Sequence, residues 1–311
     1  MRHIQKRVYA LITAITVLLS TCSVSAAAAE SSESASIPRK ENSLGAAAAC
    51  AGHTLGTFSG VPACVNENGD LHICENNFPD ENFRAYVLGL TGAEDGYLSP
   101  QECNLVSYIW VSGSNIKTLS GIEYFNMLTD LDCSSNQLTE LDVSNNAKLT
   151  DLGCSNNQLT KLDVKNNTKL AKLFCYGNPI TELNIQSNTA LTYLDCHECL
   201  LTELNVNGNT ALTSLECSDN QLTELKVDGC IALNSLWCES NQLAELDISS
   251  NKQLEHLDCE SNQLTDLYVN NNSLLLYLNC GFNQLKELNI QNNSRLTSVL
   301  LEQSIDRIEY K

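Results

Sequence analysis

Apolar residues recur along much of this chain in a fixed order, with polar residues between them. The segment that begins at Leu128 places Leu131 and Cys133 two positions apart, and the same pattern returns 21 residues later. Eight copies follow one another, and they begin at Leu128, Leu149, Leu170, Leu191, Leu212, Leu233, Leu254 and Leu275. Self-similarity at this period predicts a solenoid of stacked coils.

Each unit also contains a shorter echo of itself. Leu141 and Val143 repeat the spacing of Leu131 and Cys133. Alternate residues of a strand face the same side, so each pair predicts a short strand with one buried face. The predicted fold class is therefore a mainly β solenoid with a β-strand on both sides of each coil and a small helical N-terminal cap. A single coil cannot bury its own apolar side chains, so stacking closes the core.

Asparagine fills two more positions in nearly every unit. The first series is Asn136, Asn157, Asn178, Asn220, Asn241, Asn262 and Asn283, and the second is Asn146, Asn167, Asn188, Asn209, Asn251, Asn272 and Asn293. Where the backbone leaves a strand, its polar groups still need partners, and a buried amide offers both a donor and an acceptor. Cys199 and Cys230 replace asparagine, and because a thiol bonds weakly, they are predicted weak points.

Cysteine forms a third series inside the predicted core: Cys133, Cys154, Cys175, Cys196, Cys217, Cys238, Cys259 and Cys280. A metal site needs ligands that converge on one point, whereas the side chains of stacked coils run parallel. Buried free cysteine behaves as a small hydrophobic residue. The series therefore predicts a structural cysteine ladder, with no metal and no cofactor.

The first 63 residues have a different character. Residues 1–29 predict a secretory signal peptide, with basic residues, a 12-residue apolar run and small residues before the cleavage point. The apolar run is too short to span a bilayer, which needs about 20 residues. An alternative is a lipoprotein attached at Cys22, because residues 19–22 resemble a lipobox. Residues 30–63 predict a linker with irregular structure. The sequence lacks a sortase-type LPxTG signal, so we expect an exported protein without a wall anchor, either secreted or at the cell surface.

Residues 64–105 predict an N-terminal cap. Asn68-Gly69 favours a hairpin turn, which would bring Cys64 near Cys74 and make this pair the expected disulfide of an exported protein. Phe83, Val87 and Leu88 suit one face of a helix. Residues 91–102 resemble a degenerate EF-hand loop, but Thr91 and Ala93 stand where calcium ligands belong. We therefore expect a helix–loop–helix that covers the end of the core and binds no calcium. The repeat domain is predicted over 106–311 and ends in a short C-terminal cap.

The unit L-x-x-L-x-C-x-x-N-x-L followed by L-x-x-L-D-V-x-x-N resembles the leucine-rich repeat family. It is similar to the nested 21-residue bacterial subtype called IRREKO and to the repeats of the internalin J group of Listeria surface proteins. The resemblance covers residues 128–295 closely. It implies the solenoid fold and a binding protein, but it names no ligand, because one fold serves many functions.

The outward positions of the first strand differ from those of the second. Both tryptophans of the chain lie on the first strand, whereas the second strand carries Tyr268 as its one aromatic residue. Exposed aromatic residues on a rigid sheet are common at binding hot spots. The candidate binding residues are Tyr108, Trp110, Phe174, Tyr176, Tyr193, His197, Trp237, His256, Asp258 and Tyr277.

Charge narrows the choice of partner. The chain has 37 acidic and 18 basic residues and a net charge of −19, which argues against nucleic acid. The sequence shows no nucleophile–base pairing, so we expect no enzyme. The predicted function is a secreted bacterial module that binds a protein, on a host or a cell surface, through a patch of basic residues on that partner. The alternative is a carbohydrate-binding or surface-coat protein, whose sugar stacking would survive high salt.

Overall fold

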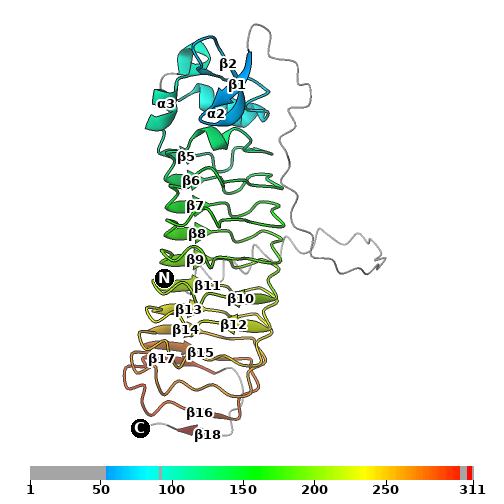
Figure 1. Ribbon diagram of the computed structural model, residues 1–311. Coiled ribbons are helices and arrows are strands. Elements are labelled where there is room, and N and C mark those ends of the chain that lie inside the picture. Colours follow the sequence, from blue (N-terminus) through cyan, green and yellow to red (C-terminus); the bar gives the residue numbers. More distant parts are fainter. Residues whose placement is uncertain (1–53, 91–92, 302–306, 310–311) are drawn as a thin grey trace, which may run out of the picture. The chain divides into compact units, whose positions relative to one another are not determined.

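The computed structural model describes residues 54–90, 93–301 and 307–309 (Figure 1). The expected signal peptide, the lipobox-like Cys22 and residues 30–53 of the expected linker lie outside the described residues, and so does Thr91. Among the described residues, no helix combines the length and the apolar character that crossing a membrane requires.

The repeats form a β-solenoid whose main sheet has ten parallel strands in the order β17-β15-β14-β13-β11-β9-β8-β7-β6-β5 (Figure 1). Each strand has three residues. Their bounds are β5 Tyr108–Trp110, β6 Asp130–Asp132, β7 Asp151–Gly153, β8 Lys172–Phe174, β9 Tyr193–Asp195, β11 Ser214–Glu216, β13 Ser235–Trp237, β14 His256–Asp258, β15 Tyr277–Asn279 and β17 Ser298–Leu300. Neighbouring strands pair at equivalent positions of the unit, as Leu215 does with Leu236. This exact repetition confirms the 21-residue period.

The core is a set of parallel columns of leucine and cysteine. Leu236 and Cys238 are fully buried, as are their equivalents in the neighbouring coils. Burial raises the pKa of the Cys217 and Cys238 thiols well above the ordinary value, because a thiolate would be poorly solvated there. The thiol of Cys238 donates to the backbone oxygen of Asp258 in the next coil, at 3.4 Å. The ladder cysteines thus act as small, protonated core residues.

The opposite side of the coils has fewer strands than the sequence predicts. Strands form there at β10 (Glu203–Asn205), β12 (Glu224–Lys226), β16 (Glu287–Asn289) and β18 (Arg307–Glu309), in the pairs β10–β12 and β16–β18. At the other described coils the equivalent segments, such as residues 141–143, form no ladder of backbone hydrogen bonds. The expectation of a strand on both sides of every coil is therefore wrong. The apolar spacing fixes which side chains are buried, but it does not require neighbouring backbones to pair.

The first asparagine series connects the coils as predicted. Asn241 Nδ2 donates to the backbone oxygens of Cys217 and Cys238, at 3.0 and 3.1 Å, and its Oδ1 accepts the backbone N–H of Leu222 at 3.0 Å. Each member of the series therefore ties its own coil to the preceding one. Because both ends of the amide are used, these turns stay buried without unpaired backbone groups.

The second asparagine series uses only half of its bonding capacity. Asn251 Nδ2 donates to the backbone oxygens of Val227 and Cys230, at 2.9 and 2.8 Å. Its Oδ1 is buried and has no hydrogen-bond partner among the described residues, and the other six members share this feature. The expectation that each amide would serve as both donor and acceptor holds for the first series alone.

Cys199 and Cys230 interrupt the two series with weak bonds. The Cys199 thiol donates to the backbone oxygen of Cys175 at 3.5 Å, and the Cys230 thiol to that of Val206 at 3.0 Å. At the first break, the N–H of Ile180 loses the usual amide acceptor and turns to the backbone oxygen of Asn178 in its own coil, at 2.8 Å. The first series is therefore interrupted between the coils of β8 and β9.

Restoring the amide should stabilise the fold. Cys199→Asn is expected to raise the free energy of unfolding by about 1 kcal/mol, because the new side chain can donate to two carbonyl groups and accept one N–H. Cys230→Asn is the matched control. It should gain less, since the Oδ1 in that series has no donor. Chemical denaturation of both variants checks this, and an equal gain, or a loss at Cys199, would contradict it.

The N-terminal cap begins earlier than the sequence predicts. Strand β1 (Thr54–Phe58) pairs antiparallel with β2 (Val61–Val65), inside the segment expected to be irregular. Ser59 and Gly60 join them with φ of 51° and 84°, which is the positive-φ geometry that tight hairpin turns need. The hairpin expected around Asn68-Gly69 is confirmed, because β2 pairs with β3 (Leu71–His72). The Cys64–Cys74 disulfide stays a prediction.

The cap packs against the first coil through aromatic residues. Helix α2 (Glu81–Leu88) buries Phe83 and Val87, whereas Leu88, expected on the same face, is 44% exposed, because it lies one residue beyond the i, i+4 pair. Phe78 lies against Gly121, where φ is 105° and an added Cβ would come within 2.3 Å of the Phe78 ring. Glycine is therefore required at the junction of cap and solenoid.

The EF-hand-like segment uses its acidic residues within the cap. It comprises η1 (Ala93–Asp95), β4 (Tyr97–Leu98) and α3 (Pro100–Leu105). The Glu102 carboxylate accepts the N–H and the hydroxyl of Ser99, both at 2.8 Å, in a capping box. The Asp95 carboxylate accepts the N–H of Tyr97 at 3.0 Å. Both carboxylates therefore hold the backbone of the cap.

This arrangement predicts that the cap does not need calcium. Calorimetric titration with calcium should show no micromolar site. Glu102→Ala should lower the free energy of unfolding by about 1 kcal/mol with and without calcium, because it removes a helix cap. A micromolar calcium site that disappears in Glu102→Ala would overturn this expectation.

Candidate binding face

The outward side chains of the ten-stranded sheet form one continuous surface, here called the sheet face. Strand pairing places equivalent positions of each unit next to one another. The first row runs from Tyr108 on β5 to Ser298 on β17, and the second from Trp110 to Leu300. All ten predicted binding residues lie on these two rows or on the second position after a strand, as Tyr176 and His197 do. The sequence therefore placed them correctly on a common side, although their roles as binding residues stay a proposal.

Aromatic side chains on the sheet face meet in four pairs. The ring centroids are 5.1 Å apart for Tyr108 and Trp110, and 5.0 Å apart for Phe174 and Tyr193. A third pair stacks the rings of Tyr176 and His197 at 4.3 Å, and a fourth places Trp237 and Tyr277 at 5.9 Å. Three of these pairs bridge different strands. The rings thus form patches that are already ordered, which lowers the entropy cost of using them in binding.

Trp237 lies between two acidic residues on the neighbouring strands. Strand pairing puts Glu216 of β11 on one side of it and Asp258 of β14 on the other. Asp258, however, is only 1% exposed, because Tyr277 Oη donates to its Oδ2 at 3.1 Å and Asn279 Nδ2 does so at 3.2 Å. The expected contact residue Asp258 therefore orders its neighbours and is not available at the surface.

The two histidines of the predicted set stand apart. His197 lies two residues after β9, and His256 lies on β14. Strands β11 and β13 separate them, so the imidazoles do not meet. His197 Nδ1 lies 2.6 Å from Asp195 Oδ1. Burial is the largest single influence on His197 and opposes its protonation. The hydrogen bond to Asp195 and the negative charges of Asp195, Glu216 and Glu198 together outweigh burial and raise its pKa.

The carboxyl group of Glu216, on the sheet face, has a raised pKa. Burial, with Asp195 as a further cause, raises its pKa to about 7, although Ser218 Oγ donates to its Oε1 at 2.8 Å. The folded protein therefore holds this proton at pH values where the unfolded chain, with a pKa near 4.5, has lost it. Glu216 stabilises the fold fully below about pH 4.5, and this contribution is lost as the pH rises through 7.

A pH series tests this linkage. Over pH 5–8, the free energy of unfolding of the parent protein should fall relative to that of Glu216→Gln, because the variant has no carboxyl to ionise. Denaturation of both proteins in matched buffers measures the difference. A constant difference across that range would show that Glu216 titrates normally.

One feature of the sheet face was not singled out from the sequence. A hollow of about 330 Å³ lies over β6, β7 and β8, with Trp110 on one side and Phe174 and Tyr176 on the other. Gly153 lines it, and it is the one glycine among the ten residues at the third position of these strands. The absence of a side chain at that position was the available signal. The sequence alone does not show that aromatic rings lie on either side of Gly153, so the hollow could not be predicted from it.

Solved structures with the same architecture identify the repeat type. The structure reported as the functional domain of internalin J from Listeria monocytogenes, including a cysteine ladder, is 34% identical, with a TM-score of 0.59 over 76% of this chain and 60% of that chain. The chain therefore has leucine-rich repeats of the internalin-like type. It spans 60% of the length of that internalin J chain.

Two more distant structures share the fold of these internalin-like repeats. Internalin C2 from Listeria monocytogenes is 21% identical, with a TM-score of 0.59 over 75% of this chain and 97% of that one. The leucine-rich repeat protein LIC12759 from Leptospira interrogans is 22% identical, with a TM-score of 0.55 over 61% and 56%. No protein-family model matches the chain, and no curated protein matches it by sequence.

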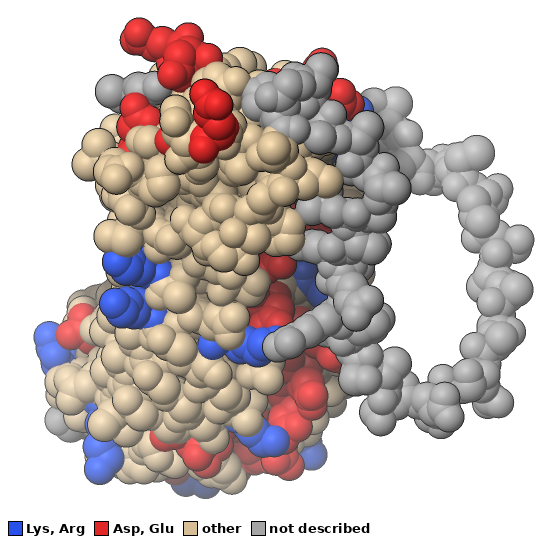
Figure 2. Space-filling view, turned by 45° about the horizontal axis from the view of Figure 1, so that its top comes forward, with Lys and Arg blue, Asp and Glu red and all other residues tan. Residues whose placement is uncertain are grey.

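The opposite side of the internalin-like repeats is acidic and polar. In Figure 2 acidic side chains follow the coils along one side of the view, on the side where β10 and β12 lie in Figure 1. The exposed acids at the start of each segment include Glu140, Glu182, Glu203, Glu224, Glu245, Asp266 and Glu287. Tyr268, 73% exposed, is the aromatic residue on this side. It has no aromatic partner among the ring contacts of the described residues.

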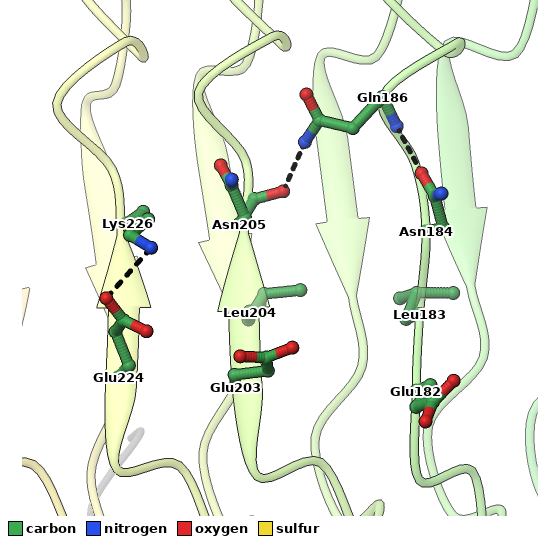
Figure 3. A pocket seen from close by; sticks show the side chains of 9 residues that line it. All are labelled: Glu182, Leu183, Asn184, Gln186, Glu203, Leu204, Asn205, Glu224 and Lys226. Atoms are coloured by element: carbon green, nitrogen blue, oxygen red, sulfur yellow. Dashed lines mark hydrogen bonds and ion pairs between the residues drawn. The ribbon is translucent and has the colours of Figure 1, made fainter. Parts of the chain in front are cut away.

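A hollow of about 380 Å³ on this side is lined mainly by polar residues, several of which bond to one another (Figure 3). Gln186 Nε2 donates to the backbone oxygen of Asn205 at 2.7 Å, and its N–H donates to Asn184 Oδ1 at 3.1 Å. Lys226 Nζ lies 2.8 Å from Glu224 Oε1. Since these groups partner one another and no ring lines the hollow, it offers a ligand less than the sheet face does.

Proposed function

We propose that these internalin-like repeats bind a protein outside the bacterial cell, through the sheet face and a basic patch on that partner. The contrast between the two sides of the same coils supports this. Trp110 is 60% exposed, and four ordered ring pairs lie on the sheet face, whereas the other side carries charge and Tyr268. Aromatic residues are enriched at the centres of protein interfaces.

The charge of the sheet face favours a basic partner. Asp130, Asp132 and Glu260 are half-buried on this face, among the aromatic pairs. Acidic side chains that line a surface attract a positively charged partner and raise its association rate, an effect that salt screens. Binding should therefore weaken as ionic strength rises. Sugar stacking, the alternative, would be insensitive to salt, so the salt dependence of any ligand separates the two.

A sheet face with two added positive charges tests the proposal. Extracellular host proteins and glycan arrays would be screened with the parent protein and with Ser214→Arg/Ser235→Arg, which places two cations on β11 and β13. The control, Gln221→Arg/Gln242→Arg, makes the same change of net charge at exposed turn positions. We expect a protein ligand that the sheet-face variant loses and the control keeps. Equal retention by both variants, or a ligand confined to glycans, would contradict the proposal.

A further inference from the structure

We propose that the hollow over β6–β8 receives an arginine side chain of the protein partner. This inference deepens the proposed function and rests on it for the source of the arginine. The hollow of about 330 Å³ is lined by the rings of Trp110, Phe174 and Tyr176 and by the carboxylate-bearing residues Asp130, Asp132 and Asp151. Aromatic faces and carboxylates are the two groups that a guanidinium contacts best.

The negative charge of the hollow is only partly balanced from within the protein. Lys172 Nζ lies 3.1 Å from Asp151 Oδ1, which balances one carboxylate. Asp130 Oδ1 accepts the indole N–H of Trp110 at 2.6 Å, and Asp132 Oδ1 accepts the N–H of Ser134 at 3.0 Å. Those two bonds come from neutral donors. Among the described residues, Asp130 and Asp132 therefore have no cationic partner, and a bound guanidinium would supply one in a charge-assisted pair.

A buried hydroxyl points independently to a missing donor. Ser155 lines the hollow and is 1% exposed, and its Oγ has no hydrogen-bond partner among the described residues. An unpaired buried polar atom is costly, so native structures usually provide a partner. A guanidinium carries five N–H donors in one plane and can serve Ser155 while it pairs with a carboxylate. An uncharged sugar would leave the two carboxylates unbalanced.

Gly153 is the residue that makes room for the ligand. In the neighbouring strands the equivalent positions carry Asp132 and Phe174. A Cβ on Gly153 would lie 3.1 Å from Asp132 Oδ1 and 3.2 Å from Ser134 Oγ, and its φ is that of an ordinary strand residue. A larger residue is therefore compatible with the strand backbone but would fill the floor of the hollow. Gly153→Val should block the ligand while the solenoid stays folded.

Tryptophan NMR of the full chain tests this inference, because Trp110 and Trp237 give only two indole N–H resonances, which Trp110→Phe assigns. The probe is N-acetyl-arginine-methylamide, and the neutral control is the matching citrulline derivative. We expect the arginine probe to shift the Trp110 resonance to saturation and to leave that of Trp237 in place. Citrulline should bind at least tenfold more weakly. Gly153→Val, and Asp132→Asn as a second and isosteric variant, should each weaken the arginine probe at least tenfold.

Three results would overturn the inference: equal binding of citrulline, equal shifts of both resonances, or a Trp110 shift with methyl glucoside. The proposed function is tested separately. If the arginine probe fails while the Ser214→Arg/Ser235→Arg variant still loses its protein ligand, the inference is wrong and the proposed function stands. If the probe binds but that variant keeps every protein ligand, the hollow binds arginine and the proposed function is wrong.

Discussion

Asn241→Ala is expected to lower the free energy of unfolding by about 3 kcal/mol, because it leaves several buried groups without partners. The N–H of Leu222 loses its acceptor, and the backbone oxygens of Cys217 and Cys238 each lose a donor. These groups lie in two successive coils, so the loss weakens the contact between neighbours as well as one turn. Stability of a stacked repeat array depends on such nearest-neighbour contacts.

Chemical denaturation of Asn241→Ala beside Gln242→Ala measures this effect. Gln242 is the adjacent residue, and its side chain is exposed, so its truncation should change stability by less than about 0.5 kcal/mol. If the two variants lose similar amounts of the free energy of unfolding, the asparagine series does not hold the coils together.

Trp237→Ala is expected to raise the dissociation constant of the protein partner at least about thirtyfold, which corresponds to roughly 2 kcal/mol. Trp237 lies on a central strand of the sheet face, its ring is ordered by Tyr277, and Glu216 lies beside it. A large ring in such a position typically anchors an interface. Folding should change little, because Trp237 lies opposite the fully buried Leu236.

Tyr268→Ala is the matched control, since it also removes one exposed ring, but from the opposite side of the solenoid. Calorimetry with the identified partner should show parental affinity for this variant. If Trp237→Ala binds as tightly as the parent protein and Tyr268→Ala loses binding, the interface lies on the side of Tyr268 and the prediction is wrong.

The repeat period explains why so much of the solenoid follows from the sequence. Each position of the unit recurs, so Leu131, Cys133 and Asn136 can each be compared with six or more equivalents, and the shared pattern indicates which side chains are buried. The cap has no such repetition. Its first hairpin went unrecognised because Gly56 and Pro62, residues more typical of loops than of strands, lie within β1 and β2. Burial patterns also do not decide whether two adjacent backbones pair, so the extra strands were predicted at too many coils.

The sequence predicts which residues share the sheet face, but it does not predict how their side chains contact one another. Alternation along a strand places Trp237 and Asp258 on the same surface. It does not reveal that Tyr277 and Asn279 bury Asp258. The hollow depends on four coils at once, because Gly153 opens a space only where Trp110 and Phe174 stand on either side. Features that arise between repeats, where their sequences differ, therefore needed the structure.

Hydroxyl-radical footprinting of the complex tests the central claim most directly, because it reports which aromatic side chains a bound partner covers. The account predicts that the partner slows oxidation of Trp237, Tyr277 and Trp110 on the sheet face and leaves the rate at Tyr268 unchanged. Protection of Tyr268 with unchanged oxidation at Trp110 and Trp237 would contradict it.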